Sequence, residues 1–78
     1  MYLHIGKNCV INDDKVIGVF CLESIEETPE YQRLYEKLVN EKRLEDISGS
    51  QKNSFILTEE KGYISGIGTN TMKKRRIV

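Results

Sequence analysis

The stretch Val16-Ile17-Gly18-Val19-Phe20-Cys21-Leu22 decides the fold of this 78-residue chain. Its β-branched and aromatic residues favour a strand. Alternation along that strand gives two apolar faces, with Ile17, Val19 and Cys21 on one and Val16, Phe20 and Leu22 on the other. A short chain covers both faces of a strand only with more than one helix, so we expect another subunit to supply part of the cover.

The residues before this strand predict a hairpin. Residues 2–5 alternate in the way a strand requires, residues 6–8 interrupt the pattern as a turn, and residues 9–11 resume it. Residues 12–15 are a polar turn that leads into the central strand.

The residues after it predict one main helix, over about 28–43. Thr28 suits the N-cap and Pro29 the first helical position. Apolar side chains then recur at helical spacing on one face: Tyr31, Leu34, Tyr35, Leu38 and Val39.

The last third predicts strands again, at 44–47, 54–58 and 62–67, with the last two joined as a hairpin. Residues 69–71 offer capping side chains for a short C-terminal helix over 72–76. The fold class that follows is α+β: a small, mostly antiparallel sheet with one main helix and a short C-terminal helix, in a single domain over 1–78.

The charge balance limits which kinds of nucleic-acid binding are possible. Twelve Lys and Arg face twelve Asp and Glu, which argues against a lone monomer that holds nucleic acid by bulk charge. The charges are uneven, however: residues 1–28 carry two basic and five acidic side chains, and residues 48–78 carry six and two. No membrane-spanning run and no signal peptide is recognisable, so we expect a cytoplasmic protein with both thiols reduced.

Catalytic and metal-binding patterns are missing from the sequence. His4, the one histidine, has no Ser, Cys or carboxylate at a spacing that would enlist it. Cys9 and Cys21 have no second pair of ligands for zinc, and the glycines do not match a phosphate loop. We therefore expect neither an enzyme nor a bound metal or cofactor.

Basic side chains in polar turns are the candidates for binding. Lys52 lies in a Ser, Gly, Gln and Asn loop of the kind whose backbone can approach a phosphate, and Lys15 and Lys7 lie on turns. Four cations end the chain: Lys73, Lys74, Arg75 and Arg76. They fit a solvated tail or helix end as well as a binding segment. Useful affinity for DNA takes about six or more phosphate contacts, which a neutral chain reaches only by multiplying its surface in an oligomer.

The order and spacing of five segments resembles the RemA/RemB family of small bacterial regulators of extracellular-matrix genes, most closely its RemB-like branch. The segments are Met1-Tyr2-Leu3-His4-Ile5-Gly6, Val16-Ile17-Gly18-Val19-Phe20, Ser54-Phe55-Ile56-Leu57-Thr58, Tyr63-Ile64-Ser65 and Thr71-Met72-Lys73-Lys74-Arg75. The resemblance implies a cytoplasmic DNA-binding transcription regulator of biofilm type that assembles into a ring-like homo-oligomer.

The same resemblance implies where duplex DNA is bound. The RemA-like contacts fall at Lys15 and in the loop Gln51, Lys52 and Asn53, with Lys7 and the segment Lys73 to Arg76 as secondary candidates. The RemA-like loop has a pair of arginines, whereas this loop has one lysine between Gln and Asn, so we expect weaker affinity per subunit.

Two other functions fit the same residues. An oligomeric protein-interaction or scaffolding module would need no basic loop. The loop here has a single lysine, which is weak evidence for DNA contact. Alternatively, the C-terminal cations could bind RNA or an anionic membrane nonspecifically. The first hypothesis remains an oligomer that arrays Lys15 and Lys52 along one surface and holds DNA by its phosphates and shape.

Overall fold

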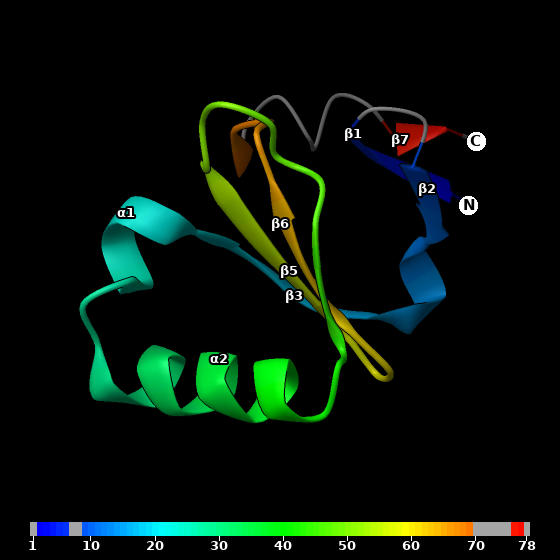
Figure 1. The fold of residues 1–78 in the computed structure, drawn as a ribbon. Coiled ribbons are helices and arrows are strands. Elements are labelled where there is room, and N and C mark those ends of the chain that lie inside the picture. The colour runs from blue at the N-terminus through cyan, green and yellow to red at the C-terminus, as the bar shows by residue number, and fades with distance from the viewer. Residues whose placement is uncertain (1, 7–8, 70–75, 78) are drawn as a thin grey trace.

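The computed structural model describes residues 2–6, 9–69 and 76–77, and it confirms an α+β fold (Figure 1). Its elements are β1 (Tyr2–Gly6), β2 (Cys9–Asn12), the 3-10 helix η1 (Asp13–Lys15), β3 (Val16–Cys21), α1 (Leu22–Ile25), α2 (Pro29–Asn40), β4 (Leu44–Asp46), β5 (Ser54–Thr58), β6 (Gly62–Ser65) and β7 (Arg76–Ile77).

The strands form two sheets, a division that the alternation pattern does not predict. The smaller sheet has the order β2-β1-β7 and the larger one β3-β5-β6-β4. Among these described strands, every pairing is antiparallel except that of β4 with β6. In Figure 1, α2 lies on one side of the larger sheet and the smaller sheet lies on the other.

The core accordingly consists of two clusters, one on each face of the larger sheet. Alternate residues of β5 enter different clusters: Ile56 packs with Leu3 and Ile5 of the smaller sheet, whereas Phe55 packs with Leu38 of α2. All five of these side chains are buried. This alternation explains why β5 is apolar along most of its length, as a strand covered on both faces should be.

The central stretch differs from the predicted strand at one residue. Ile17 has no partner on β5, because the register shifts between Val16 and Gly18. The shift places Val16 on the same face as Val19, and both pack against the cluster around Ile56. The prediction that Val16 shares a face with Phe20 is therefore wrong: an extra residue in one strand inverts the alternation beyond it.

The main helix is confirmed, with a C-terminal end that comes earlier than predicted. The Thr28 hydroxyl accepts a hydrogen bond from the Tyr31 amide (3.2 Å) and donates one to the Ile25 carbonyl (2.7 Å), so it caps α2 as expected. The helix ends at Asn40 rather than near residue 43, because Lys42 adopts the left-handed backbone (φ 58°) that stops a helix.

Two further expectations need correction. Leu22 does not end the central strand; it is buried and begins α1, a short helix that no pattern in the sequence indicates. Arg76 belongs to β7, which pairs with β1, and not to a C-terminal helix. The rest of that predicted helix, residues 72–75, lies outside the described residues.

Candidate nucleic-acid interface

The loop over residues 48–53 is held tightly at its C-terminal end. The Asn53 side-chain amide donates to the Gly66 carbonyl (2.7 Å), and the Asn53 main chain accepts from the Leu22 amide (3.0 Å). A Cβ at Gly66 would lie 2.6 Å from the Ser48 carbonyl oxygen and 3.0 Å from that of Gln51. The loop backbone therefore passes over position 66 so closely that only glycine fits there.

Two buried hydroxyls fix the strand ends next to this loop. Ser65 donates a short hydrogen bond to the Ile5 carbonyl and accepts one from the Ile67 amide (3.0 Å), so it joins the two sheets. Ser54 donates to the Ile67 carbonyl (2.5 Å). Both side chains are fully buried, and in that setting each hydroxyl requires a partner.

Lys52, the predicted contact in this loop, is paired with a carboxylate. Its Nζ lies 3.2 Å from Oδ2 of Asp46. Oδ1 of the same carboxylate accepts from the Ser48 amide (2.9 Å) and hydroxyl (2.5 Å). These hydrogen bonds from Ser48, and after them Lys52, lower the pKa of Asp46 to about 2. The carboxylate is thus charged at neutral pH and neutralises Lys52 at the surface.

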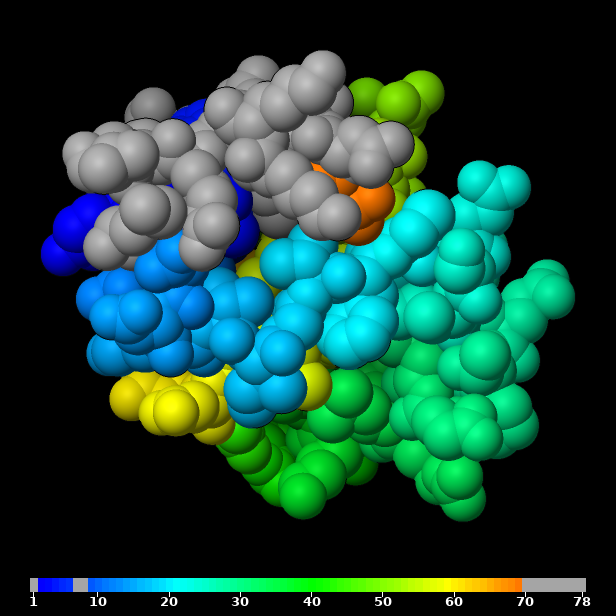
Figure 2. Space-filling model, turned by 180° about the vertical axis from the view of Figure 1, so that it is seen from behind, coloured from blue at the N-terminus to red at the C-terminus, as the bar shows by residue number. Residues whose placement is uncertain are grey.

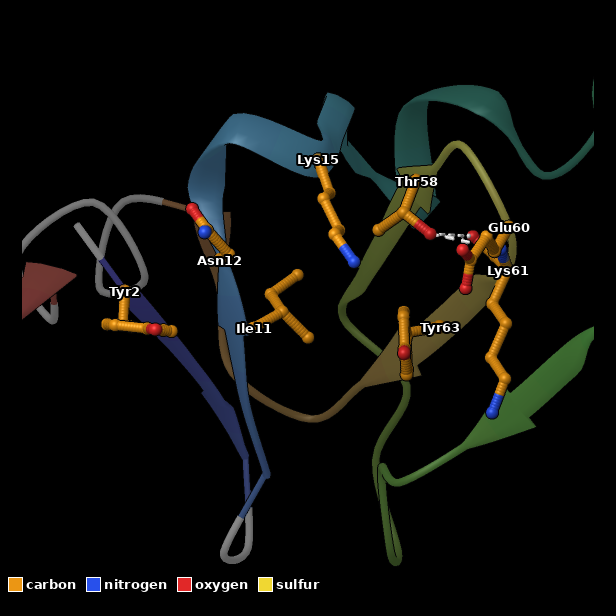
Figure 3. A pocket seen from close by; sticks show the side chains of 8 residues that line it. All are labelled: Tyr2, Ile11, Asn12, Lys15, Thr58, Glu60, Lys61 and Tyr63. Atoms are coloured by element: carbon orange, nitrogen blue, oxygen red, sulfur yellow. Dashed lines mark hydrogen bonds between the residues drawn. The ribbon is translucent and has the colours of Figure 1, made fainter.

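Gln51 and Lys15, two further predicted contacts, line different cavities of the chain. Gln51 is exposed beside a cavity of about 450 Å³ whose wall includes His4 and Ser50. Lys15 is exposed on η1 and extends into a second cavity, of about 420 Å³ (Figure 3). One chain therefore does not gather the predicted residues around one site.

The remaining basic candidates add little to the described surface. Lys7, Lys73, Lys74 and Arg75 fall outside the described residues, and Arg76 pairs across from Leu3 in the smaller sheet.

Within the described ranges, no three His, Cys, Asp or Glu side chains could hold a metal ion, and no helix is long and apolar enough to span a membrane.

The thiols differ in their surroundings. Cys21 is exposed on β3, although its place in an apolar strand predicts a small core residue. Cys9 is half-buried, and that burial, followed by the nearby Glu45 carboxylate, raises its pKa. Both are free thiols, and the raised pKa keeps Cys9 protonated at neutral pH.

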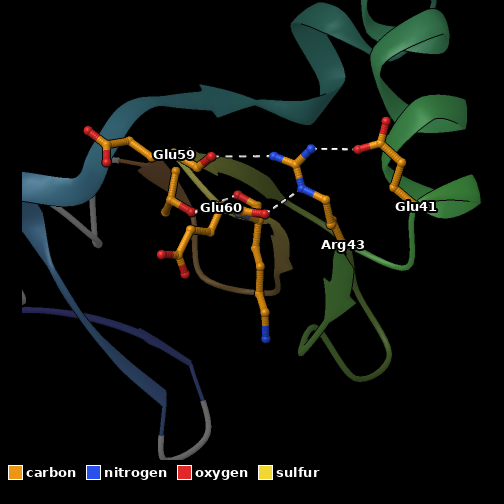
Figure 4. A network of polar contacts seen from close by, with 6 residues as sticks. Glu41, Arg43, Glu59 and Glu60 are labelled. Atoms are coloured by element: carbon orange, nitrogen blue, oxygen red, sulfur yellow. Dashed lines mark hydrogen bonds and ion pairs between the residues drawn. The ribbon is translucent and has the colours of Figure 1, made fainter.

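Arg43 is a structural cation that no motif of the sequence singles out. Its guanidinium donates to the carbonyls of Glu60 (2.6 Å) and Glu59 (3.3 Å) and pairs with the Glu41 carboxylate (2.6 Å), as Figure 4 shows. The side chain thereby joins the end of α2 to the β5–β6 turn. Two of its three partners are main-chain carbonyls 16 and 17 residues away, which no spacing rule in the sequence could reveal.

The most exposed large apolar side chain of the described residues, that of Ile17, lies on β3. Ile17 is 63% exposed and Phe20 39% exposed, and β3 is the outer strand of its sheet. Figure 2 shows this strand at the surface, between the residues of β2 and η1 (blue) and those of α2 (green). We call the exposed side chains of this outer strand, Ile17, Phe20 and Cys21, the β3 edge surface, in which the adjacent Phe20 and Cys21 point to opposite faces of the sheet. An outer strand with large apolar side chains and unpaired main-chain groups is a typical place for another chain to pack.

Comparison with known protein families identifies the family of this chain. No curated protein matches the chain. The family model described as "RemA-like: Extracellular matrix regulatory protein A-like" matches residues 2–76, which include both sheets, the β3 edge surface and the loop over residues 48–53. The match covers nearly the whole chain, and the chain therefore belongs to the RemA-like family of extracellular matrix regulatory proteins.

Proposed function

We propose that this protein is a cytoplasmic, DNA-binding regulator of extracellular-matrix and biofilm gene transcription, that it acts as a ring-like homo-oligomer, and that it belongs to the RemB-like branch of its family. The observation that carries the proposal is the β3 edge surface. Ile17 is 63% and Phe20 39% exposed, so a second subunit packed against them would gain a part of the roughly 1.5–3 kcal/mol that complete burial of such a side chain typically contributes.

Packing between unlike surfaces of successive subunits favours a ring. The β3 edge surface lies at one edge of the larger sheet, and β4 is the outer strand at the opposite edge. If the edge surface of one subunit packs against a different region of the next, the contact is heterologous and closes into a ring when the rotation permits. Each added subunit then repeats the same exposed lysine at a regular interval.

DNA contact in this proposal comes from exposed cations that the ring repeats. Lys15 has no ion pair within the described residues and is exposed, so it is the principal phosphate contact. Gln51 and Lys52 lie on the exposed part of the loop, but Lys52 must exchange Asp46 for a phosphate. Asn53 holds the loop through Gly66 rather than reaching outward. The loop has one lysine, Lys52, in place of the two arginines of the RemA-like loop, and Asp46 neutralises it. This difference supports the RemB-like assignment.

Substitution of both lysines tests the DNA surface. We expect Lys15→Ala with Lys52→Ala to weaken binding to duplex DNA and to lower the slope of log affinity against log salt by about one for each phosphate that the variant no longer neutralises. Lys37→Ala, an exposed lysine on α2, is the matched control and should leave both quantities unchanged. Unchanged affinity and slope in the double variant would place the DNA surface elsewhere.

A scaffolding module is the second candidate, and the Asp46–Lys52 ion pair favours it. A lysine already neutralised by a carboxylate offers less to a phosphate than a free one does. Asp46→Asn separates the two candidates, since it frees Lys52. The regulator should gain affinity for DNA, while a scaffold should bind DNA neither before nor after the change.

A further inference from the structure

An apolar groove, which we call the β3–α2 groove, lies between the outer strand β3 and helix α2. At its base is the buried Phe55 of β5, whose ring centroid lies 6.3 Å from that of Phe20 and 5.2 Å from that of Tyr31. The other apolar side chains that line it are Ile25 of α1, Leu34 of α2 and Leu57 of β5. In Figure 1 the chain passes from β3 through α1 to the start of α2, so consecutive elements surround the groove.

The size and chemistry of the groove favour the side chains of a partner over a small molecule. Its volume of about 190 Å³ is below the roughly 300 Å³ at which sites for drug-sized ligands begin. The Thr28 hydroxyl also lines it, but this hydroxyl already donates to the Ile25 carbonyl (2.7 Å) and accepts from the Tyr31 amide (3.2 Å). The groove therefore offers mainly apolar surface, which large apolar side chains can cover.

The charge beside this groove is negative. Glu30 is the one charged residue among the described residues that line it. Glu26 also lies close, because its carboxylate, after burial and the neighbouring Tyr35, raises the pKa of Tyr31. Both glutamates are exposed, and neither forms an ion pair with another described residue. Residues 16–32 as a whole hold four glutamates and no lysine or arginine, in a chain that is neutral overall.

An apolar groove with an acidic rim is complementary to a helix that is apolar on one face and basic on the other. Amphipathic helices bind such grooves by inserting apolar side chains spaced i, i+3, i+4 and i+7. Lysines or arginines on the flanks of that helix would lie beside Glu26 and Glu30, where opposite charges speed association and select the partner. An acidic helix would meet like charges at the same rim.

We propose that the β3–α2 groove binds a basic amphipathic helix of another protein, whose apolar side chains pack against Phe20, Tyr31 and Leu34. This partner site is additional to the proposed DNA surface, since neither Lys15 nor the loop over residues 48–53 lines the groove. It shares Phe20 with the β3 edge surface, whereas Ile17 and Cys21 do not line it.

Fluorescence anisotropy of three labelled synthetic helices, each titrated with the full chain, tests the chemistry of the partner. The first helix has leucines at i, i+3, i+4 and i+7 and lysines on its opposite face. The second has glutamate in place of each lysine, and the third has the composition of the first in scrambled order. The first should bind, and the other two should bind about tenfold or more weakly, because each lacks one half of the match. Equal binding of the three, or no binding of the first at submillimolar concentration, would overturn the proposal.

Glu26→Gln with Glu30→Gln tests the groove itself. This double variant should bind the first helix about threefold to tenfold more weakly, the value of two exposed ion pairs, and with a smaller dependence on salt. Glu36→Gln with Glu45→Gln is the matched control, because it changes the net charge equally at exposed positions that do not line the groove. Its affinity should stay near that of wild type, and equal affinities of the two double variants would overturn the proposal.

Light scattering of the same variants distinguishes a second copy of this chain as the occupant. The native mass of Glu26→Gln with Glu30→Gln should equal that of wild type, and a lower mass would overturn the proposal by assigning the groove to a contact between copies. Affinity for duplex DNA, measured in parallel, should be the same in the two double variants, because both remove two negative charges outside the proposed DNA surface. Failure of the helix site is therefore distinguishable from failure of the DNA surface.

Discussion

At the scale of single residues, two kinds of contact explain which residue a position holds: close packing against the backbone, as at Gly66, and ion pairing, as at Asp46. Gly66 has no side chain because the Ser48 and Gln51 carbonyls occupy the place of a Cβ. Asp46 forms an ion pair with Lys52 and accepts a hydrogen bond from the Ser48 amide. The sequence indicates that Gly66 permits a turn, but the loop that passes over it lies more than ten residues earlier and has no visible signal.

Gly66→Ala should lower the free energy of unfolding by about 1–3 kcal/mol, as overpacking against a fixed backbone typically does. Urea denaturation measures it. Gly68→Ala is the matched control, because a Cβ there meets nothing within 4 Å. Equal stability of the two variants would contradict the tight packing of the loop against position 66.

Asp46 should give the stability a component that depends on acid pH. Its folded pKa of about 2 lies below the ordinary value of 3.8, so the folded state favours the carboxylate. Its contribution is therefore complete above about pH 5 and disappears as pH falls toward 2. We expect the difference in free energy of unfolding between wild type and Asp46→Asn to be constant from pH 7 to about 5 and to shrink below that. A difference that does not change with pH would contradict the Ser48 and Lys52 contacts.

At the scale of elements, strand and helix type follow from local pattern, whereas sheet membership does not. Thr28 and Pro29 mark the start of α2, and the apolar run in residues 54–58 marks β5. The bulge at Ile17 cannot be predicted from the sequence. One extra residue in a strand does not change the amino-acid composition, but it reverses which residues face each side of the sheet beyond it. The two-sheet arrangement depends on contacts such as that of Ser65 with Ile5, 60 residues apart.

The position of Ile17 gives the element-scale prediction. Because this side chain is 63% exposed and outside both core clusters, Ile17→Lys should leave the fold intact and separate the subunits. Light scattering should show the mass fall to that of one chain at micromolar concentration. Val10→Lys, an exposed apolar position on β2 of the other sheet, should keep the wild-type mass. A wild-type protein that is already a monomer would remove the oligomer on which the proposed function depends.

At the scale of the whole molecule, the proposed DNA binding depends on assembly, because the chain itself is neutral. The family is evident from segments spread over nearly the entire chain, and its model matches residues 2–76. The site is less predictable: Lys15 is exposed as expected, but the Asp46 partner of Lys52 and the inward bond of Asn53 depend on how the loop folds back. Twelve positive and twelve negative side chains leave no bulk attraction to DNA, so in the proposed function the attraction comes from regular repetition of Lys15.

Fluorescence anisotropy of a labelled random duplex, titrated with the wild-type protein at two salt concentrations, tests this account most directly. Phosphate-directed binding by an assembly predicts a clear rise in anisotropy at low salt, with affinity that falls steeply at the higher concentration because salt competes with several phosphate-bound lysines at once. Absence of binding at both salt concentrations would contradict the account and favour the scaffolding module instead.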